Sequence, residues 1–179
     1  EEIWWTALNE IFKASEVEAD SLQQKKIFYQ ILATMCKYLY DNADYKFEIG
    51  KGITLKEGTD VSIFATGLEV SEALEAARML EKDGISAEVI NIHTIKPIDE
   101  ELIVASATKT GKVVTVEEHS IIGGLGSAVA EVLIEKAPTK MLRIGVNDRF
   151  GESGPALELI HKYGLDAEGI YKKVKAFCK

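Results

Sequence analysis

The chain has 179 residues, of which 46% are hydrophobic and 28% are charged, a composition typical of a soluble globular protein. Its formal net charge of −8 argues against binding to nucleic acid or to an anionic membrane, because contacts with phosphate need clustered lysine and arginine. Cys36 and Cys178 lie far apart without metal-ligand spacing, and no apolar run approaches the roughly 20 residues that span a bilayer, so we expect reduced thiols in a cytoplasmic protein.

The first 43 residues are predicted to form a helical hairpin. One apolar stripe at helical spacing runs from Ile3 to Phe12, and a second runs from Ile27 to Tyr40. Asp20 or Ser21 is suited to cap the second helix. Two amphipathic helices with a short link make an αα-hairpin, and each needs a surface that covers its stripe.

After residue 43 the pattern changes to alternating strands and helices. Residues 45–49 and 52–55 alternate in polarity, which indicates edge strands. Short apolar runs predict four further strands, at residues 61–66, 87–92, 112–116 and 141–146. Helical periodicity and capping residues predict helices over residues 71–82, from Asp99 to near Gly111, over residues 126–136, from Pro155 through Ile160, and from Asp166 to the end.

Apolar strands separated by helices imply a mostly parallel sheet that is covered on both faces. The crossovers between such strands are right-handed. The early alternating strand is expected to add one antiparallel edge. We therefore predict an open three-layer α/β sandwich over residues 44–179, preceded by the helical hairpin of residues 1–43.

In an open α/β sheet, ligands and partners meet the carboxyl ends of the strands. Four polar segments, three of which contain glycine, follow the four predicted strands, at residues 67–69, 93–97, 117–127 and 147–154. We predict that this edge is the functional one and that it serves as an interface or a ligand edge. The candidate residues are Glu117, Glu118, His119, Gly123, Gly124, Gly126, Ser127, Asp148, Arg149, Glu152 and Ser153.

The third of these segments has features of an anion site. Gly124 and Gly126 open a helix, whose free N–H groups suit an anion. However, Val129 stands where the dinucleotide pattern needs a third glycine, and Glu117 and Glu118 would repel phosphate. The structural alternative is that the glycines permit tight turns and close packing of the helix. A free-standing module that binds a small anion or a protein stays a second interpretation.

His119 beside Glu118 looks like half of an acid–base pair. Adjacent residues on a strand point to opposite faces, however, and no serine or cysteine stands in a nucleophile pattern. We therefore interpret His119 as an interface residue. His93 and His161 belong to other elements, and the three histidines lack zinc spacing. We predict no catalytic, cofactor-binding or metal-binding residue in this chain.

Several segments resemble the C-terminal domain of transketolases. They are residues 44–52, residues 60–67 (Asp-Val-Ser-Ile-Phe-Ala-Thr-Gly), residues 114–127 with the sequence Glu-Glu-His-Ser-Ile-Ile-Gly-Gly-Leu-Gly-Ser at their end, and residues 150–154 (Phe-Gly-Glu-Ser-Gly) followed by Tyr163-Gly164-Leu165. Loops similar to residues 114–127 also occur in deoxyxylulose-phosphate synthases and in β subunits of 2-oxo-acid dehydrogenases. The equivalent domain of one of these enzymes is therefore a third interpretation, although residues 150–154 favour transketolase. The resemblance covers about three quarters of the chain.

The resemblance implies transfer of two-carbon ketol units between sugar phosphates, as in the pentose phosphate pathway, with thiamine diphosphate and a divalent cation such as Mg²⁺. In that family other domains hold the cofactor, and this chain has no Gly-Asp-Gly motif followed by the metal-ligand asparagine. The resemblance therefore implies a structural and interface role, an isolated chain that is inactive, cofactor-binding domains or a cofactor-binding subunit as the partner, and a homo-oligomer in the full enzyme.

Residues 1–43 do not resemble the end of the pyrimidine-binding domain that would precede this domain in the family. We hypothesise that their apolar stripes cover surface that the missing domains would otherwise bury. A stable complex with the cofactor-binding part that forms without displacing the hairpin would count against this hypothesis.

Overall fold

A computed structural model describes residues 48–179 of the chain. The predicted helical hairpin of residues 1–43 lies outside the described residues. Residues 48–179 contain five strands, namely β1 (Ile53–Lys56), β2 (Val61–Ala65), β3 (Ala87–Asn91), β4 (Lys112–Ser120) and β5 (Lys140–Val146). Three helices connect successive strands from β2 onward, namely α3 (Glu69–Lys82), α4 (Glu100–Thr110) and α5 (Leu125–Lys136). Two further helices follow β5, namely α6 (Ala156–Tyr163) and α7 (Ala167–Cys178).

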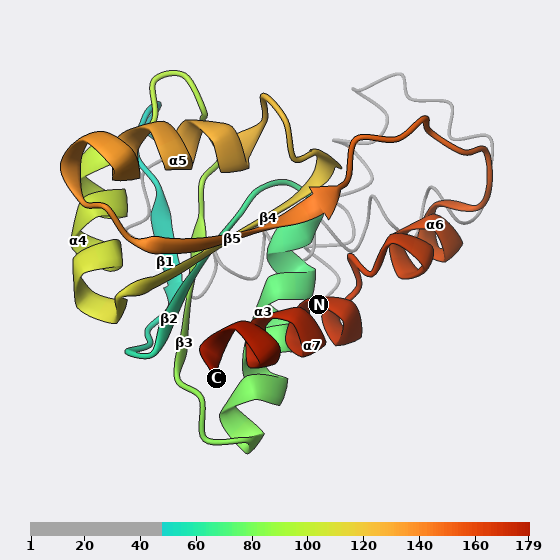
Figure 1. The fold of residues 1–179 in the computed structure, drawn as a ribbon, viewed down its shortest axis with the longest axis horizontal. Helices are drawn as coiled ribbons and strands as arrows, with labels where there is room; N and C mark the ends of the chain where they lie inside the picture. Colours follow the sequence, from blue (N-terminus) through green and yellow to red (C-terminus); the bar gives the residue numbers. More distant parts are fainter. Residues whose placement is uncertain (1–47) are drawn as a thin grey trace, which may run out of the picture.

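The strands form one mixed sheet in the order β1-β3-β2-β4-β5 (Figure 1). Strands β3, β2, β4 and β5 are parallel to one another, and β1 pairs antiparallel with β3 through Ile53 opposite Asn91. The predicted parallel sheet with one antiparallel edge strand is confirmed. A parallel sheet requires helical crossovers, which explains why the helices alternate with the strands along the sequence.

Each face of the sheet packs against its own pair of helices (Figure 1). Val61, Ile63 and Ala65 of β2 point to one side, where they belong to the core that includes Ala77 of α3 and Val174 of α7. The alternate residue Phe64 points to the other side and joins the core built with α4 and α5. The twofold alternation along β2 therefore supplies both cores, because successive side chains leave a strand on opposite faces. The three-layer arrangement follows from this alternation.

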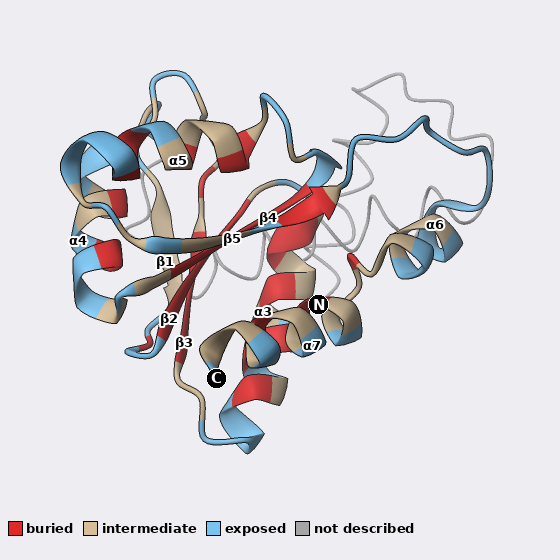
Figure 2. Ribbon diagram, in the orientation of Figure 1, coloured by how far each residue is buried: buried red, intermediate tan, exposed pale blue. Residues whose placement is uncertain are grey.

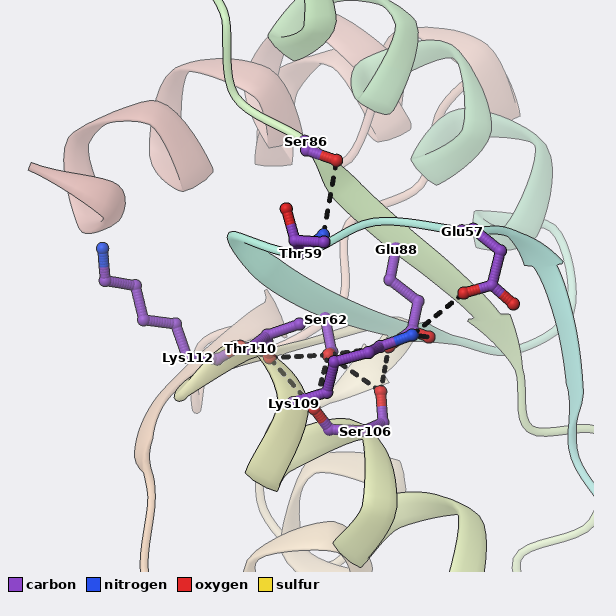
Figure 3. A network of polar contacts seen from close by, with 9 residues as sticks. All are labelled: Glu57, Thr59, Ser62, Ser86, Glu88, Ser106, Lys109, Thr110 and Lys112. Carbon is purple, nitrogen blue, oxygen red and sulfur yellow. Dashed lines mark hydrogen bonds and ion pairs between the residues drawn. The ribbon is translucent and has the colours of Figure 1, made fainter.

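A buried polar network fastens α4 to the sheet (Figure 3). Ser62 of β2 donates a hydrogen bond of 2.9 Å to the carboxylate of Glu88 on β3, and Ser106 of α4 bonds to the same carboxylate. Lys109 pairs with Glu88 and also with Glu57 at 2.9 Å. Glu88 is almost fully buried, so this carboxylate depends on its donors for stability. The partners of Glu88 in this network all belong to the same chain, which leaves Glu88 no role at the surface.

Two local expectations differ from the structure. The strand expected at residues 45–49 is not present in its described part, because Ile49 and Gly50 form a turn in which Lys51 N–H donates to the Glu48 carbonyl. Gly50 has φ +81°, which ends an extended segment. Strand β4 extends to Ser120 instead of ending at Val116. The helices otherwise begin and end within a few residues of the predicted positions, with Asp99 and Asp166 as side-chain caps.

The sheet and the segment that follows β5 differ sharply in burial (Figure 2). The centres of β2, β3 and β4 are buried, whereas residues 147–158, which follow β5, are all exposed. This segment and α6 extend away from the sheet (Figure 1). Within residues 48–179, no helix is both long enough and apolar enough to cross a bilayer.

Candidate functional site

The carboxyl ends of β2, β3, β4 and β5 lie at one edge of the sheet, because these four strands are parallel. We call this the carboxyl edge and define it by the segments that follow the four strands, which are residues 66–68, 92–99, 121–124 and 147–155. This is where the topology of an open α/β sheet places ligands and partners. All the site residues predicted from the sequence lie on this edge or directly next to it.

The carboxylate of Glu117 binds to backbone N–H groups at the N-terminus of α5. It is almost fully buried, and its two oxygens accept hydrogen bonds from Leu125 N–H and Gly126 N–H, each of 2.8 Å. A Cβ atom at Gly124 would lie only 1.9 Å from a Glu117 oxygen, so glycine is required for the carboxylate to reach the helix. The free N–H groups that suggested an anion site are therefore used by an internal anion. Glu117 acts inside the chain rather than at its surface.

The segment after β4 is held in place by short polar contacts. Ser120 Oγ accepts from Ile122 N–H at 3.2 Å, and Ser127 Oγ accepts from Gly123 N–H at 2.9 Å. Arg143 of β5 donates to the Ile121 carbonyl at 2.8 Å. These bonds fix a loop whose outer side chain, Ile122, is 61% exposed. An apolar side chain that a rigid loop holds in water is typical of a protein contact.

Glu118 and His119 are exposed at the end of β4. Glu118 lies beside the turn after β2, where its carboxylate is 3.8 Å from the position of a Cβ at Gly67. Glu117 therefore faces α5 while Glu118 faces the turn that leads into α3, as the alternation of a strand requires. Neighbouring side chains were predicted to point to opposite faces as long as the strand continues, and β4 continues to Ser120.

Glu69, the first residue of α3, was not predicted as a site residue. Its side chain is 0% exposed, and neither carboxylate oxygen has a hydrogen-bond partner. Burial raises the pKa of Glu69 to about 8, the negative charges of Glu118 and Glu72 add to this rise, and Lys173 opposes it. From the sequence, an acidic residue in the first turn of a helix indicates only a favourable interaction with the helix dipole.

Within residues 48–179, the segment after β5 carries the largest exposed apolar side chain. Phe150 is 97% exposed and lies between Arg149 and Glu152, two of the predicted contact residues. The Arg149 guanidinium stands 5.5 Å from the centre of the Tyr163 ring, and Glu152 pairs with Lys162 of α6. Contacts with α6 thus support both sides of Phe150. The remaining predicted residues of this segment, Asp148 and Ser153, are exposed beside it.

The segments that follow β4 and β5 contact each other, whereas the segment that follows β3 lies apart from them. Ile121 N–H donates to the Val146 carbonyl at 3.1 Å, and Gly145 packs directly against the His119 carbonyl. The second segment instead contacts the start of the described chain, since Thr94 Oγ accepts from Gly50 N–H at 2.8 Å. His93 lies in this second segment, and burial lowers its pKa. The candidate site is therefore the half of the carboxyl edge formed by residues 66–69, 117–127 and 147–155.

Residues 50–170 match the family described as transketolase, C-terminal domain. A protein of Methanocaldococcus jannaschii named as a transketolase C-terminal section is 55% identical over 138 residues, which are 76% of this chain and 43% of that protein. A 6-deoxy-6-sulfo-D-fructose transketolase subunit of a Clostridium species is 48% identical over 163 residues, which are 86% of this chain and 51% of the subunit.

A solved structure described as a split-gene transketolase in an inactive β4 tetramer superimposes with a TM-score of 0.71 at 56% identity. The superposition covers 74% of this chain and 44% of that one. This chain spans about half the length of the curated relatives that it matches. In each of these relatives, the part without a counterpart in this chain is about as long as the matched part.

The described residues lack a clustered set of metal ligands, and the N-terminus of α5 is closed to a phosphate group. Within residues 48–179, no group of three or more histidine, cysteine or acidic side chains is arranged to hold a cation. The α5 terminus, which is the helix N-terminus suggested by the glycines for a phosphate, is taken by Glu117. We therefore derive no chemical step through the cofactor from these residues.

Proposed function

This chain belongs to the transketolase C-terminal domain family, and from that premise we propose that it is the C-terminal section of a transketolase built from separate sections or subunits. In this proposal a cofactor-binding section performs ketol transfer between sugar phosphates with thiamine diphosphate and Mg²⁺, and this chain completes the fold and assembly of the enzyme. The match of residues 50–170 to the family and the names of the two relatives support this assignment.

The observation that carries the proposal is the form of the carboxyl edge. It offers a preformed loop with exposed Ile122, and beside it the fully exposed Phe150, as protruding contacts. The anion site expected at the base of this loop holds Glu117. Protruding apolar side chains on a supported backbone are suited to insertion into a partner surface, where they become the energetically dominant contacts.

The partner and the assembly are part of the proposal. The solved relative is described as a split-gene enzyme whose β chains form an inactive tetramer, which supports a chain that associates with itself and lacks activity alone. We propose that this chain likewise assembles with a cofactor-binding section, in an enzyme that contains more than one copy of each. The cytoplasmic location expected from its two spaced cysteines stays a prediction.

The sugar substrate is proposed only as a class. One relative is named for a sulfonated sugar, so membership of the family does not select the pentose phosphate pathway. We propose a ketose donor that carries an anionic group, with its binding residues on the cofactor-binding section. Comparing several phosphorylated and sulfonated ketoses in the assembled enzyme identifies the substrate.

The test mixes this chain with the transketolase N-terminal section from the same genome. We expect a complex by light scattering after size exclusion, and ketol transfer only when both chains, thiamine diphosphate and Mg²⁺ are present. Ketol transfer by this chain alone with the same additions would overturn the proposal. A thermal shift of the isolated chain with a sugar phosphate or a nucleotide would favour a free-standing binding module instead.

A matched pair of variants tests the proposed contact. Ile122→Ala should weaken the complex by about tenfold or more, because it removes an anchor from the centre of the edge. Ile134→Ala removes a similarly exposed side chain from α5, away from the carboxyl edge, and should leave the affinity unchanged. Equal effects of the two substitutions would show that the edge is not the interface.

A further inference from the structure

Glu69 is a buried carboxyl group without a partner at the carboxyl edge. Its side chain is 0% exposed, and neither oxygen accepts a hydrogen bond. Buried polar groups in folded proteins are nearly always paired, so each exception needs a cause. The contrast with Glu117 and Glu88 is informative, because these two buried carboxylates of the same domain each have at least two donors.

The surroundings of Glu69 have too few cations. Glu118 from β4, Glu72 from α3 itself and Asp166 at the start of α7 all place negative charge near it. Lys173 of α7 is the opposing charge, but its ammonium group already donates to the carbonyls of Tyr163 at 3.3 Å and Gly164 at 2.8 Å. Glu72 is also engaged, since it accepts from Ala167 N–H at 2.8 Å. An additional cation would therefore be stabilised here.

The backbone hydrogen bonds of the turn that leads into Glu69 are long. The side chain of Leu68, the N-cap residue of α3, accepts no hydrogen bond from the helix, Ser71 Oγ donates to the Leu68 carbonyl at 3.0 Å, and Gly67 has φ +60°. The first backbone bonds of this turn are long, at 3.4 Å from Val70 N–H to the Gly67 carbonyl and 3.3 Å from Ser71 N–H to the Leu68 carbonyl. Gly67 itself is exposed on the carboxyl edge. A small shift of this turn opens a route from the edge to the carboxyl group.

We propose that Glu69 is the receiving group for a cationic side chain of the cofactor-binding section, so that assembly of the two chains releases a proton from Glu69. The inference rests on the proposed function, because it places the partner at the carboxyl edge. The incoming group is a guanidinium or an ammonium, since these supply both the charge and the N–H donors that the two oxygens lack. The proton passes to the buffer.

The protonation arithmetic sets the size of the effect. With a pKa of about 8, Glu69 is about 90% protonated at pH 7, whereas a carboxylate paired with a cation is fully ionised there. Assembly at pH 7 should therefore release about 0.9 proton per copy of this chain. For the same reason the association constant should rise nearly tenfold for each pH unit between pH 6 and pH 7.

The experiment is titration calorimetry of this chain with the N-terminal section, at pH 7 in buffers of low and high ionisation enthalpy. The slope of the measured enthalpy against the buffer enthalpy gives the number of protons released. Glu69→Gln should abolish the slope while the complex still forms. Glu131→Gln, which makes the same substitution at an exposed position on α5, should keep the wild-type slope.

The outcomes separate the inference from the proposed function. A wild-type complex that forms without proton release, and with an affinity that is the same at pH 6 and pH 7, would overturn the role of Glu69 and leave the assembly proposal standing. A proton release that survives in Glu69→Gln would overturn it as well. Failure of the wild-type chains to associate would overturn the proposed function itself. The wild-type measurements need no variant to fold.

Discussion

Glu69→Gln should stabilise the isolated chain at neutral pH. Glutamine has nearly the shape of glutamic acid but never ionises. Keeping Glu69 protonated in the folded state at pH 7 costs about 3 kcal/mol, at about 1.4 kcal/mol for each pH unit above the ordinary pKa of 4.5. The variant escapes this cost, so its free energy of unfolding at pH 7 should exceed that of the wild type by about this amount.

The sign of the pH dependence follows from linkage. The folded pKa of Glu69, about 8, lies above the unfolded value near 4.5, so the unfolded chain binds fewer protons between these limits. The wild type should therefore lose stability as the pH rises from about 4.5 to about 8, and the loss should end there. Below this window the two proteins should differ little, and above it the difference should reach about 5 kcal/mol.

The assay is urea unfolding followed by circular dichroism at pH 5, 7 and 8.5, with low protein concentration to avoid association. Glu131→Gln is the same substitution at an exposed position on α5, so it controls for the replacement itself and should follow the wild type. Parallel profiles for the wild type and Glu69→Gln across the three pH values would refute the reasoning, because they would mean that Glu69 titrates normally in the folded chain.

Other substitutions test the buried carboxylates. Gly124→Ala should lower the free energy of unfolding by about 3–5 kcal/mol in urea, because a Cβ 1.9 Å from a Glu117 oxygen would displace the carboxylate from two buried hydrogen bonds. Gly151→Ala, at an open position, should change the free energy of unfolding by less than about 0.5 kcal/mol. Equal effects would contradict this account. Lys109→Met should lower stability by about 1–3 kcal/mol, because Glu88 keeps its hydroxyl donors but loses its cation, and an unchanged thermal midpoint would show that the ion pair contributes nothing.

The layered fold was predictable because each element carries a local signal. The apolar run at residues 61–65 alternates between two cores, which marks a strand buried on both faces, and Asp99 and Asp166 mark the helix starts that the structure shows at those caps. The antiparallel edge was predictable from the alternation at residues 52–55, and all four residues of β1 are only partly buried, as expected for an edge strand. Signals of this kind depend on neighbours in sequence alone.

The extent of β4 and the roles of the acidic residues were not predictable, because they depend on tertiary contacts. The sequence does not distinguish Glu117 from Glu118. The alternation of β4 nevertheless places Glu117 at the N-terminus of α5 and Glu118 at the surface. Ser120 belongs to the strand only because Val146 pairs with it after an irregularity in the register. Glu69 has the sequence context of an ordinary helix start, and only packing shows that its charge has no partner.

The carboxylate of Glu117 behaves as a built-in ligand, and this has a consequence for redesign. Glu117→Ala would vacate a space that is sized for a carboxylate and would leave the amide groups of Leu125 and Gly126 without an acceptor. Formate or acetate added to that variant should enter the vacancy and restore stability in a concentration-dependent manner. The N-terminus of α5 is thus an anion-binding site that Glu117 of the same chain occupies.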